Sequence, residues 1–293
     1  MKNVVKIINK KCIFVNKFTF YQKYMMSFKK TILFVSLFLL LSSTSNGQGT
    51  TKDNTISQFP IIGISLGYTF PKGDMGKKFS PYVQAGGNFL FKTNKNWVFG
   101  AEGNFISGND NLKDDARREI LKGLYNSQGF VPGSGEIQNN INQFNLDAGV
   151  TAHNRGFNVL LKGGKIFPIN KSNPNSGIFL MGGAGITQSK IIYKATAGEI
   201  PQLIGDYARG YDRKNRGFQL TEFVGYWHMV NSSRYLNFYI GVEFGQSWSN
   251  SLREYQFDLK AKDTKTYFDN TYTLKAGWMI PLGSKKTNEF YFN

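Results

Sequence analysis

The chain has 293 residues, a formal net charge of +17 and an aromatic content of 15%. Its only cysteine, Cys12, lies near the N-terminus, which excludes disulfides and thiol chemistry from the rest of the chain. The basic excess is spread out without a dense run of lysine or arginine, which argues against nucleic-acid binding.

The N-terminal region has the three parts of a secretory signal peptide. Residues 26–30 (MSFKK) are basic, residues 31–41 (TILFVSLFLLL) are apolar, and residues 42–48 (SSTSNGQ) supply small side chains for cleavage before Gln48. The apolar run is too short for a transmembrane helix, and no cysteine follows it to carry a lipid anchor. We therefore expect residues 1–47 to be an over-called start plus a signal peptide that is removed. Without their eight lysines the formal net charge falls to +9.

The remaining sequence contains eight segments that are predicted to be β-strands. Each is rich in aromatic and β-branched residues and is bounded by polar, turn-forming residues. In chain order they span residues 61–70, 81–91, 97–107, 156–167, 177–192, 216–229, 235–249 and 270–281.

The connections between these segments alternate in length. The odd-numbered ones, 71–80, 108–155, 193–215 and 250–269, are longer than the even-numbered ones, 92–96, 168–176 and 230–234. A barrel of the outer membrane has long external loops and short periplasmic turns, a rule that a secreted β-sandwich does not follow. The alternation predicts an all-β fold, an eight-stranded antiparallel up-and-down transmembrane β-barrel over residues 61–282. A periplasmic lead (48–60) and a periplasmic tail (283–293) would flank it.

Residues within the strands alternate between apolar and polar, as a lipid-exposed barrel requires. In segment 235–249, Phe238, Ile240 and Phe244 are predicted to face lipid, whereas Asn237 and Glu243 face the lumen. The same alternation of lipid-facing apolar and lumen-facing polar residues is predicted for segments 97–107, 156–167 and 270–281. Segment 216–229 fits neither register, and its facing stays open.

Four charged side chains are predicted to point into the lumen from four different strands. They are Glu102, Lys162, Glu243 and Lys275. The lumen of an eight-stranded barrel is just wide enough to be filled by side chains, and isolated charges in a closed interior are expensive. We therefore expect these side chains to pair and to plug a barrel that does not conduct; the alternative is an ion or proton pathway.

No catalytic, cofactor or metal site is expected. The motif Gly63-Ile64-Ser65-Leu66-Gly67 resembles a hydrolase nucleophile elbow, but it lies in mid-strand with no helix following. The two histidines, His153 and His228, are far apart and have no metal ligands at suitable spacing. A lipid-modifying role for His228 with Ser232 or Ser233 rests on residue type alone.

The long second external loop, 108–155, contains one short predicted helix, which Asn109 or Asp110 could cap. Its apolar side chains repeat on one face, either to pack on the protein's own loops or to dock an external partner. They are Leu112, Ala116, Ile120 and Leu124.

The expected periplasmic rim is basic. Its turns and tail carry several cations against one acid, Glu289, which suits contact with lipid phosphates or with an acidic periplasmic partner. The cations are Lys92, Lys95, Lys171, Arg234, Lys285 and Lys286.

The second half of the chain resembles a group of Bacteroidota outer-membrane barrels. The similar stretches are residues 161–168 (LKGGKIFP), 174–185 (PNSGIFLMGGAG), 201–213 (PQLIGDYARGYDR), 217–226 (GFQLTEFVGY) and 236–246 (LNFYIGVEFGQ). The group is similar to the PorG-type component of the type IX secretion system. This resemblance implies a small barrel that binds a periplasmic ring made of a lipoprotein and its soluble partner. It transfers no catalytic residues.

Together these features lead us to expect a non-enzymatic barrel, integral to the bacterial outer membrane with both termini in the periplasm. We expect it to anchor a periplasmic, type IX-like secretion complex without a cofactor. The alternative is a stand-alone OmpX/OmpA-like barrel whose external loops bind surface ligands or host proteins.

Overall fold

The computed structural model describes residues 58–126, 129–132, 143–145, 149–171, 173–196, 199–229 and 236–282. All of these belong to one compact unit, Asp53–Asn293. The expected signal peptide and the C-terminal tail lie outside the described residues.

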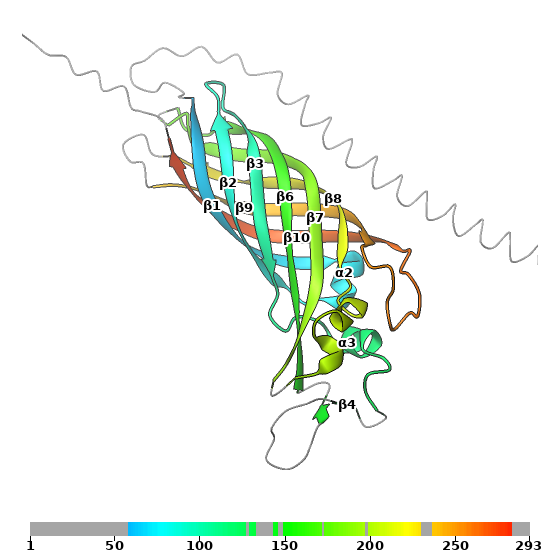
Figure 1. Ribbon diagram of the computed structural model, residues 1–293. Helices are drawn as coiled ribbons and strands as arrows, with labels where there is room; N and C mark the ends of the chain where they lie inside the picture. The colour runs from blue at the N-terminus through cyan, green and yellow to red at the C-terminus, as the bar shows by residue number, and fades with distance from the viewer. Residues whose placement is uncertain are drawn as a thin grey trace, which may run out of the picture. The chain divides into compact units, whose positions relative to one another are not determined.

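Eight antiparallel strands close into a barrel, with each strand paired to its neighbours along the sequence (Figure 1). This confirms the predicted fold. The strands are β1 (Phe59–Lys72), β2 (Tyr82–Lys92), β3 (Trp97–Ser107), β6 (Val150–Pro168), β7 (Gly177–Ala195), β8 (Asn215–His228), β9 (Asn237–Ser251) and β10 (Thr266–Pro281). The pairing of residues can be followed once around the barrel, from each strand to the next. Starting at Pro168 of β6, it returns to β6 at Asn158. This stagger tilts the strands against the barrel axis.

The two ends of the barrel differ as predicted. We call the end where β1 begins and β10 finishes the turn end, and the opposite end the loop end. The turn-end connections, 93–96, 169–176 and 229–236, are shorter than the loop-end connections, 73–81, 108–149, 196–214 and 252–265.

The wall of the barrel is apolar on its outer side, whereas its inner side carries both polar side chains and a buried apolar cluster. Leu66 and Leu161 are 61% and 72% exposed, and all eight strands contribute outward aromatic or aliphatic side chains to an apolar band. Monomeric soluble proteins rarely expose so large an apolar surface, so this is the distribution of a transmembrane β-barrel. The predicted facing of β3, β6, β9 and β10 is confirmed. Strand β8 turns Phe218 and Val224 outward and Phe223 and Trp227 inward.

No helix among the described residues has the length and apolar composition needed to cross a bilayer.

Two neighbouring strands extend further toward the loop end than predicted. Strand β6 begins at Val150 instead of residue 156, and β7 continues to Ala195 instead of residue 192, with these two residues paired. Beyond the apolar band the alternation inverts, because the outer side meets water and the inner side packs against the loops. Val150 and Ala152 therefore point inward while Thr151 points outward, a pattern that a search for outward apolar residues misses.

The loop end carries its own small apolar core. It includes inward residues of the β6 and β7 extensions and residues of the neighbouring loops. The loop elements are α2 (Gly73–Lys78), α3 (Asp114–Ile120), β4 (Phe130–Pro132), which pairs with β5 (Gln143–Asn145), and the 3-10 helices η1 (Pro201–Leu203) and η2 (Tyr207–Gly210).

The predicted helix of the long loop packs on the protein itself. Leu112, Ala116 and Ile120 are buried in the loop-end core, and Leu124 packs against it. Helix α3 begins after Lys113 without a side-chain cap, so the predicted caps are wrong. Asp110 instead accepts a hydrogen bond of 2.9 Å from the backbone N–H of Ala152, which ties the loop to β6.

Candidate functional site

The four predicted lumen charges meet at the centre of the barrel. Lys162 donates a hydrogen bond to Glu243, and Lys275 donates one to Glu102. Lys275 Nζ also lies 3.0 Å from Glu243 Oε2, and Lys162 Nζ lies 3.9 Å from Glu102 Oε1. The four side chains are at most 6% exposed. Two positive and two negative charges therefore neutralise one another, as predicted.

A chain of polar side chains continues from these charges toward the loop end. Asn104 Nδ2 donates to Glu102 Oε1 at 2.6 Å, and Ser65 Oγ donates to Asn104 Oδ1 at 3.2 Å. Thr69 and Gln84 extend the chain, with Gln84 Nε2 donating to Thr69 Oγ1 at 2.8 Å. Such bonds offset part of the desolvation cost of buried charges.

The turn-end half of the lumen is filled by apolar and aromatic side chains. Trp227 and Phe179 meet edge to face with ring centroids 4.8 Å apart, and Trp227 stacks on Tyr239 at 6.2 Å. A Cβ atom at Gly277 would lie 2.3 Å from the Tyr239 ring, so only glycine leaves room for this aromatic cluster. The paired charges and the aromatic rings therefore fill successive parts of the lumen. The remaining members of this core are Ile61, Leu90, Val98, Ile166, Met181, Phe223, Met229 and Met279.

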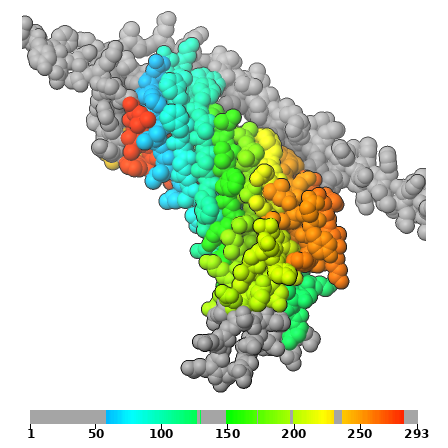
Figure 2. Space-filling model, viewed as in Figure 1, coloured from blue at the N-terminus to red at the C-terminus, as the bar shows by residue number. Residues whose placement is uncertain are grey.

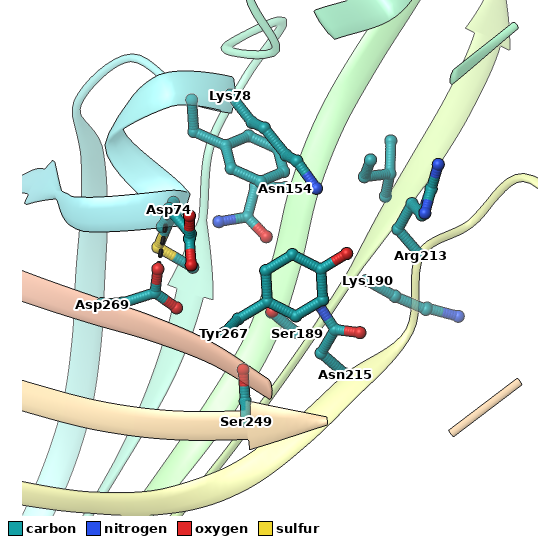
Figure 3. A pocket seen from close by; sticks show the side chains of 13 residues that line it. Asp74, Lys78, Asn154, Ser189, Lys190, Arg213, Asn215, Ser249, Tyr267 and Asp269 are labelled. Atoms are coloured by element: carbon teal, nitrogen blue, oxygen red, sulfur yellow. Dashed lines mark hydrogen bonds between the residues drawn. The ribbon is translucent and has the colours of Figure 1, made fainter. Parts of the chain in front are cut away.

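A small polar cavity lies at the loop end, beneath α2 (Figure 3). The backbone N–H of Met75 donates to Asp269 Oδ1 at 2.5 Å and so fixes α2 over the barrel mouth. Both polar side-chain atoms of Asn154, which lines the cavity, lack a hydrogen-bond partner in the described structure. The cavity volume is about 30 Å³, which fits ordered water but no organic ligand.

Buried ion pairs join two of the loops at the loop end. Arg213 forms salt bridges with Asp258 and Asp263, the latter at 3.2 Å. Arg253 Nε donates to Asp212 Oδ1 at 2.9 Å, and this hydrogen bond raises the pKa of the Arg253 guanidinium. Burial raises the pKa of the Asp258 carboxyl. These contacts hold residues 204–213 and 252–263 together as one unit, which we call the loop-end platform; Figure 2 shows the two loops side by side.

The platform presents apolar side chains to solvent. The Phe257 ring sits where a Cβ atom at Gly210 would be, and the backbone N–H of Phe257 donates to Gly210 O at 3.1 Å. Tyr207 and Tyr255 on the same unit are 68% and 49% exposed. The other exposed apolar residues are Ile204, Leu252 and Leu259. Several apolar side chains of the two loops are thus exposed outside the barrel wall. Neither of its loops has a regular sequence pattern, so periodicity could not reveal it.

The predicted turn-end cations occupy different environments. Lys95 and Lys171 are exposed on their turns. Lys92 is fully buried and donates to Asn175 Oδ1 at 2.9 Å, because it ends β2 on the lumen side. Lys92 is therefore not part of an exposed rim. Arg234, Lys285 and Lys286 lie outside the described residues.

The serine and histidine residues that were weighed as catalytic or metal-binding candidates take part in the packing and hydrogen bonding of the barrel. Ser65 is buried in the middle of β1 and faces the lumen. The Nδ1 atom of His153 accepts a hydrogen bond of 3.1 Å from the backbone N–H of Asp110. The His228 ring lies 4.8 Å from that of Phe238, and Ser232 and Ser233 are not among the described residues. Within the described ranges, no group of His, Cys, Asp and Glu side chains is arranged to hold a metal ion.

No family model matches the chain, and no curated protein sequence matches it. Solved structures similar to it include the attachment invasion locus protein Ail of Yersinia pestis (12% identity, 76% of this chain and 98% of that chain, TM-score 0.34). Others are Neisserial surface protein A (8% identity, 75% and 96%, TM-score 0.39) and the outer membrane protein OprG of Pseudomonas aeruginosa (12% identity, 79% and 99%, TM-score 0.30). At these identities and TM-scores the likeness says nothing about ligands or partners.

Proposed function

We propose that this protein is a non-conducting barrel of the bacterial outer membrane that binds a macromolecular partner through its loop-end platform. The turn end faces the periplasm and the loop end faces the cell exterior, as in barrels with long external loops. The observation that carries this proposal is the exposure of Tyr207, Tyr255 and Leu259 on two loops that buried ion pairs hold together.

The ion pairs of the platform fix the geometry of its loops more than they stabilise the protein. Buried ion pairs contribute little net stability, because desolvation offsets their attraction. They do hold the loops in one geometry. Exposed apolar surface of this kind marks interaction sites, and tyrosine is enriched among residues that dominate binding energy. A preorganised platform also loses little conformational entropy on binding.

Substituting both Tyr207 and Tyr255 with serine tests this proposal. The barrel, reconstituted in nanodiscs, is probed with extracellular-matrix proteins, polysaccharides and intact cells of the producing bacterium. The serine variant should lose at least about tenfold in affinity for the probe that binds. The matched phenylalanine variant should retain binding, because the apolar ring remains. Absence of binding by every probe, or binding that the serine variant leaves unchanged, would contradict the proposal.

The exposed turn-end cations favour a second candidate, anchoring of a periplasmic secretion ring. Lys95 and Lys171 are exposed, and the described turn-end connections contain no acidic residue. The resemblance to PorG-type barrels points the same way. Under this reading, the Lys95→Glu and Lys171→Glu variant loses pull-down of the periplasmic partner, whereas replacement of residues 252–265 by a short turn spares secretion. The reverse outcomes favour the platform.

Either function requires a closed barrel, so the purified protein should form no stable ohmic channels in planar bilayers. The paired charges and the aromatic cluster occupy the lumen, which in a barrel of eight strands is just wide enough to be filled by side chains. Reproducible unitary conductance from protein shown to be folded by heat-modifiable gel migration would contradict a sealed lumen.

A further inference from the structure

One carboxylate faces outward from the middle of the barrel wall. Along β8 the outward residues run from the loop end to the turn end as Arg216, Phe218, Leu220, Glu222, Val224, Tyr226 and His228. Glu222 thus has three outward residues on either side, of which the two nearest on each side are apolar. It lies near the centre of the apolar band rather than at a headgroup boundary.

Glu222 has no ionic partner on its own wall. Among the described residues of the eight strands it is the only outward-facing acid, since Glu102, Glu243 and Asp269 point inward. Its direct neighbours across the sheet are Gly182 and Phe244. Within the described part of the chain, no hydrogen bond or ion pair reaches its carboxylate.

The outer face of the wall beside this carboxylate has two neighbouring positions without side chains. Gly163 pairs with Gly182, and Gly182 pairs with Glu222, so two positions of this row lack a side chain. A Cβ atom built on Gly182 would have no other atom nearer than 3.9 Å, so the space above Gly182 is open, whereas the Phe99 ring lies 3.4 Å from the Cβ position of Gly163. Small residues of this kind let another membrane-spanning segment approach the backbone closely.

A second copy of this wall does not supply the missing charge. Lys165, the outward cation toward the turn end, has its ammonium 5.2 Å from the ring of Trp97, the first residue of β3. Toward the loop end, Arg216 donates to Gln188 Oε1 at 2.7 Å. The other outward cations of the described strands also lie toward the loop end: Lys72, Arg155, Lys190 and Lys194.

We propose that Glu222 and the open space above the adjoining Gly182 form a lateral contact for a different membrane-spanning protein that places a lysine or arginine at mid-depth. An ionisable residue directed at lipid is costly unless it is paired, and in membrane proteins it marks a functional site. Charge complementarity identifies the partner's cation, and the open space above Gly182 identifies where the partner's backbone approaches. This contact is separate from both the loop-end platform and the turn-end rim.

Photocrosslinking in the producing bacterium tests the contact. A benzoylphenylalanine replaces Phe244, beside Glu222, and in a control it replaces Phe89, which faces outward from β2 and is 55% exposed. Irradiation should give one specific adduct from position 244 and none from position 89. Mass spectrometry of the adduct should identify another membrane protein, crosslinked within a spanning segment that contains lysine or arginine. The Glu222→Leu variant should reduce the adduct by about tenfold or more.

A stability measurement separates this role from a structural one. In vesicles that contain only the purified barrel, Glu222→Leu should unfold at the same or a higher urea concentration, because no partner is present to pair with the carboxylate. A clear decrease would make Glu222 a structural residue and overturn the proposal. So would the absence of an adduct, a homodimeric adduct, or a partner without a cation at the crosslinked depth.

Discussion

Substitution of Glu243 with leucine is expected to lower the free energy of unfolding of the barrel by about 3–5 kcal/mol. Glu243 contacts both Lys162 and Lys275, and its side chain is 6% exposed. Its removal leaves two ammonium groups in a closed lumen with only Glu102 to neutralise them. Urea unfolding in detergent micelles, followed by tryptophan fluorescence, measures the loss.

The double variant Lys162→Met with Glu243→Leu is the matched control. It removes one charge of each sign and leaves the Lys275–Glu102 pair intact. Replacing a buried ion pair by apolar side chains of similar volume is often neutral or stabilising, so the double variant should recover most of the lost stability. If the double variant is as unstable as Glu243→Leu, mutual neutralisation is not what these side chains provide.

Substitution of Trp227 with alanine should lower the free energy of unfolding by about 3–5 kcal/mol. The Trp227 side chain is completely buried in the turn-end half of the lumen, where it contacts Phe179 and Tyr239. Its removal leaves a cavity that the rigid barrel wall cannot close. Unfolding of the purified barrel in vesicles gives the size of the effect.

Trp278 provides a matched comparison, because it is 43% exposed on the outer face of β10. Trp278→Ala leaves lipid rather than a cavity in place of the ring, so its loss of stability should be clearly smaller. Equal losses for the two variants would mean that the aromatic cluster is not the packed core of the lumen.

Much of the fold could be predicted because lipid imposes a simple pattern. The outer wall requires an apolar residue at every second position, which places Phe238, Ile240 and Phe244 outside and Glu243 inside. The unequal lengths of the connections supply the strand order. The pairing of the lumen charges also follows, since four charges in so narrow a space have few other partners.

Strand β8 does not follow the apolar-out, polar-in pattern of the other strands. Its inward Phe223 and Trp227 belong to the aromatic cluster, and its outward Glu222 interrupts the apolar band. Both faces of the strand therefore depart from the pattern, each for a different reason. Apolar and polar residues therefore occur on both faces of β8, and the sequence alternation alone could not show which face is outward.

The long-range contacts of the loops and strand ends could not be predicted from the sequence either. The sequence predicts Lys92 to be an exposed turn-end cation. Its side chain instead points into the lumen and donates a hydrogen bond to Asn175, which belongs to the distant 169–176 turn. The contact of Arg213 with Asp258 and Asp263 joins loops that share no pattern. Such contacts depend on how the closed barrel brings its connections together.

The central claim is that the outer wall of the barrel meets lipid while its interior is filled. Cys12 is the only cysteine, so in a Cys12→Ser background a single cysteine introduced into β9 is the only site that a nitroxide label can modify. In vesicles, labels at Phe238, Ile240 and Phe244 should collide with oxygen and not with a water-soluble nickel chelate. A label at Tyr239 should be reached by neither. Equal access of the nickel chelate to the outward and inward positions would contradict the account.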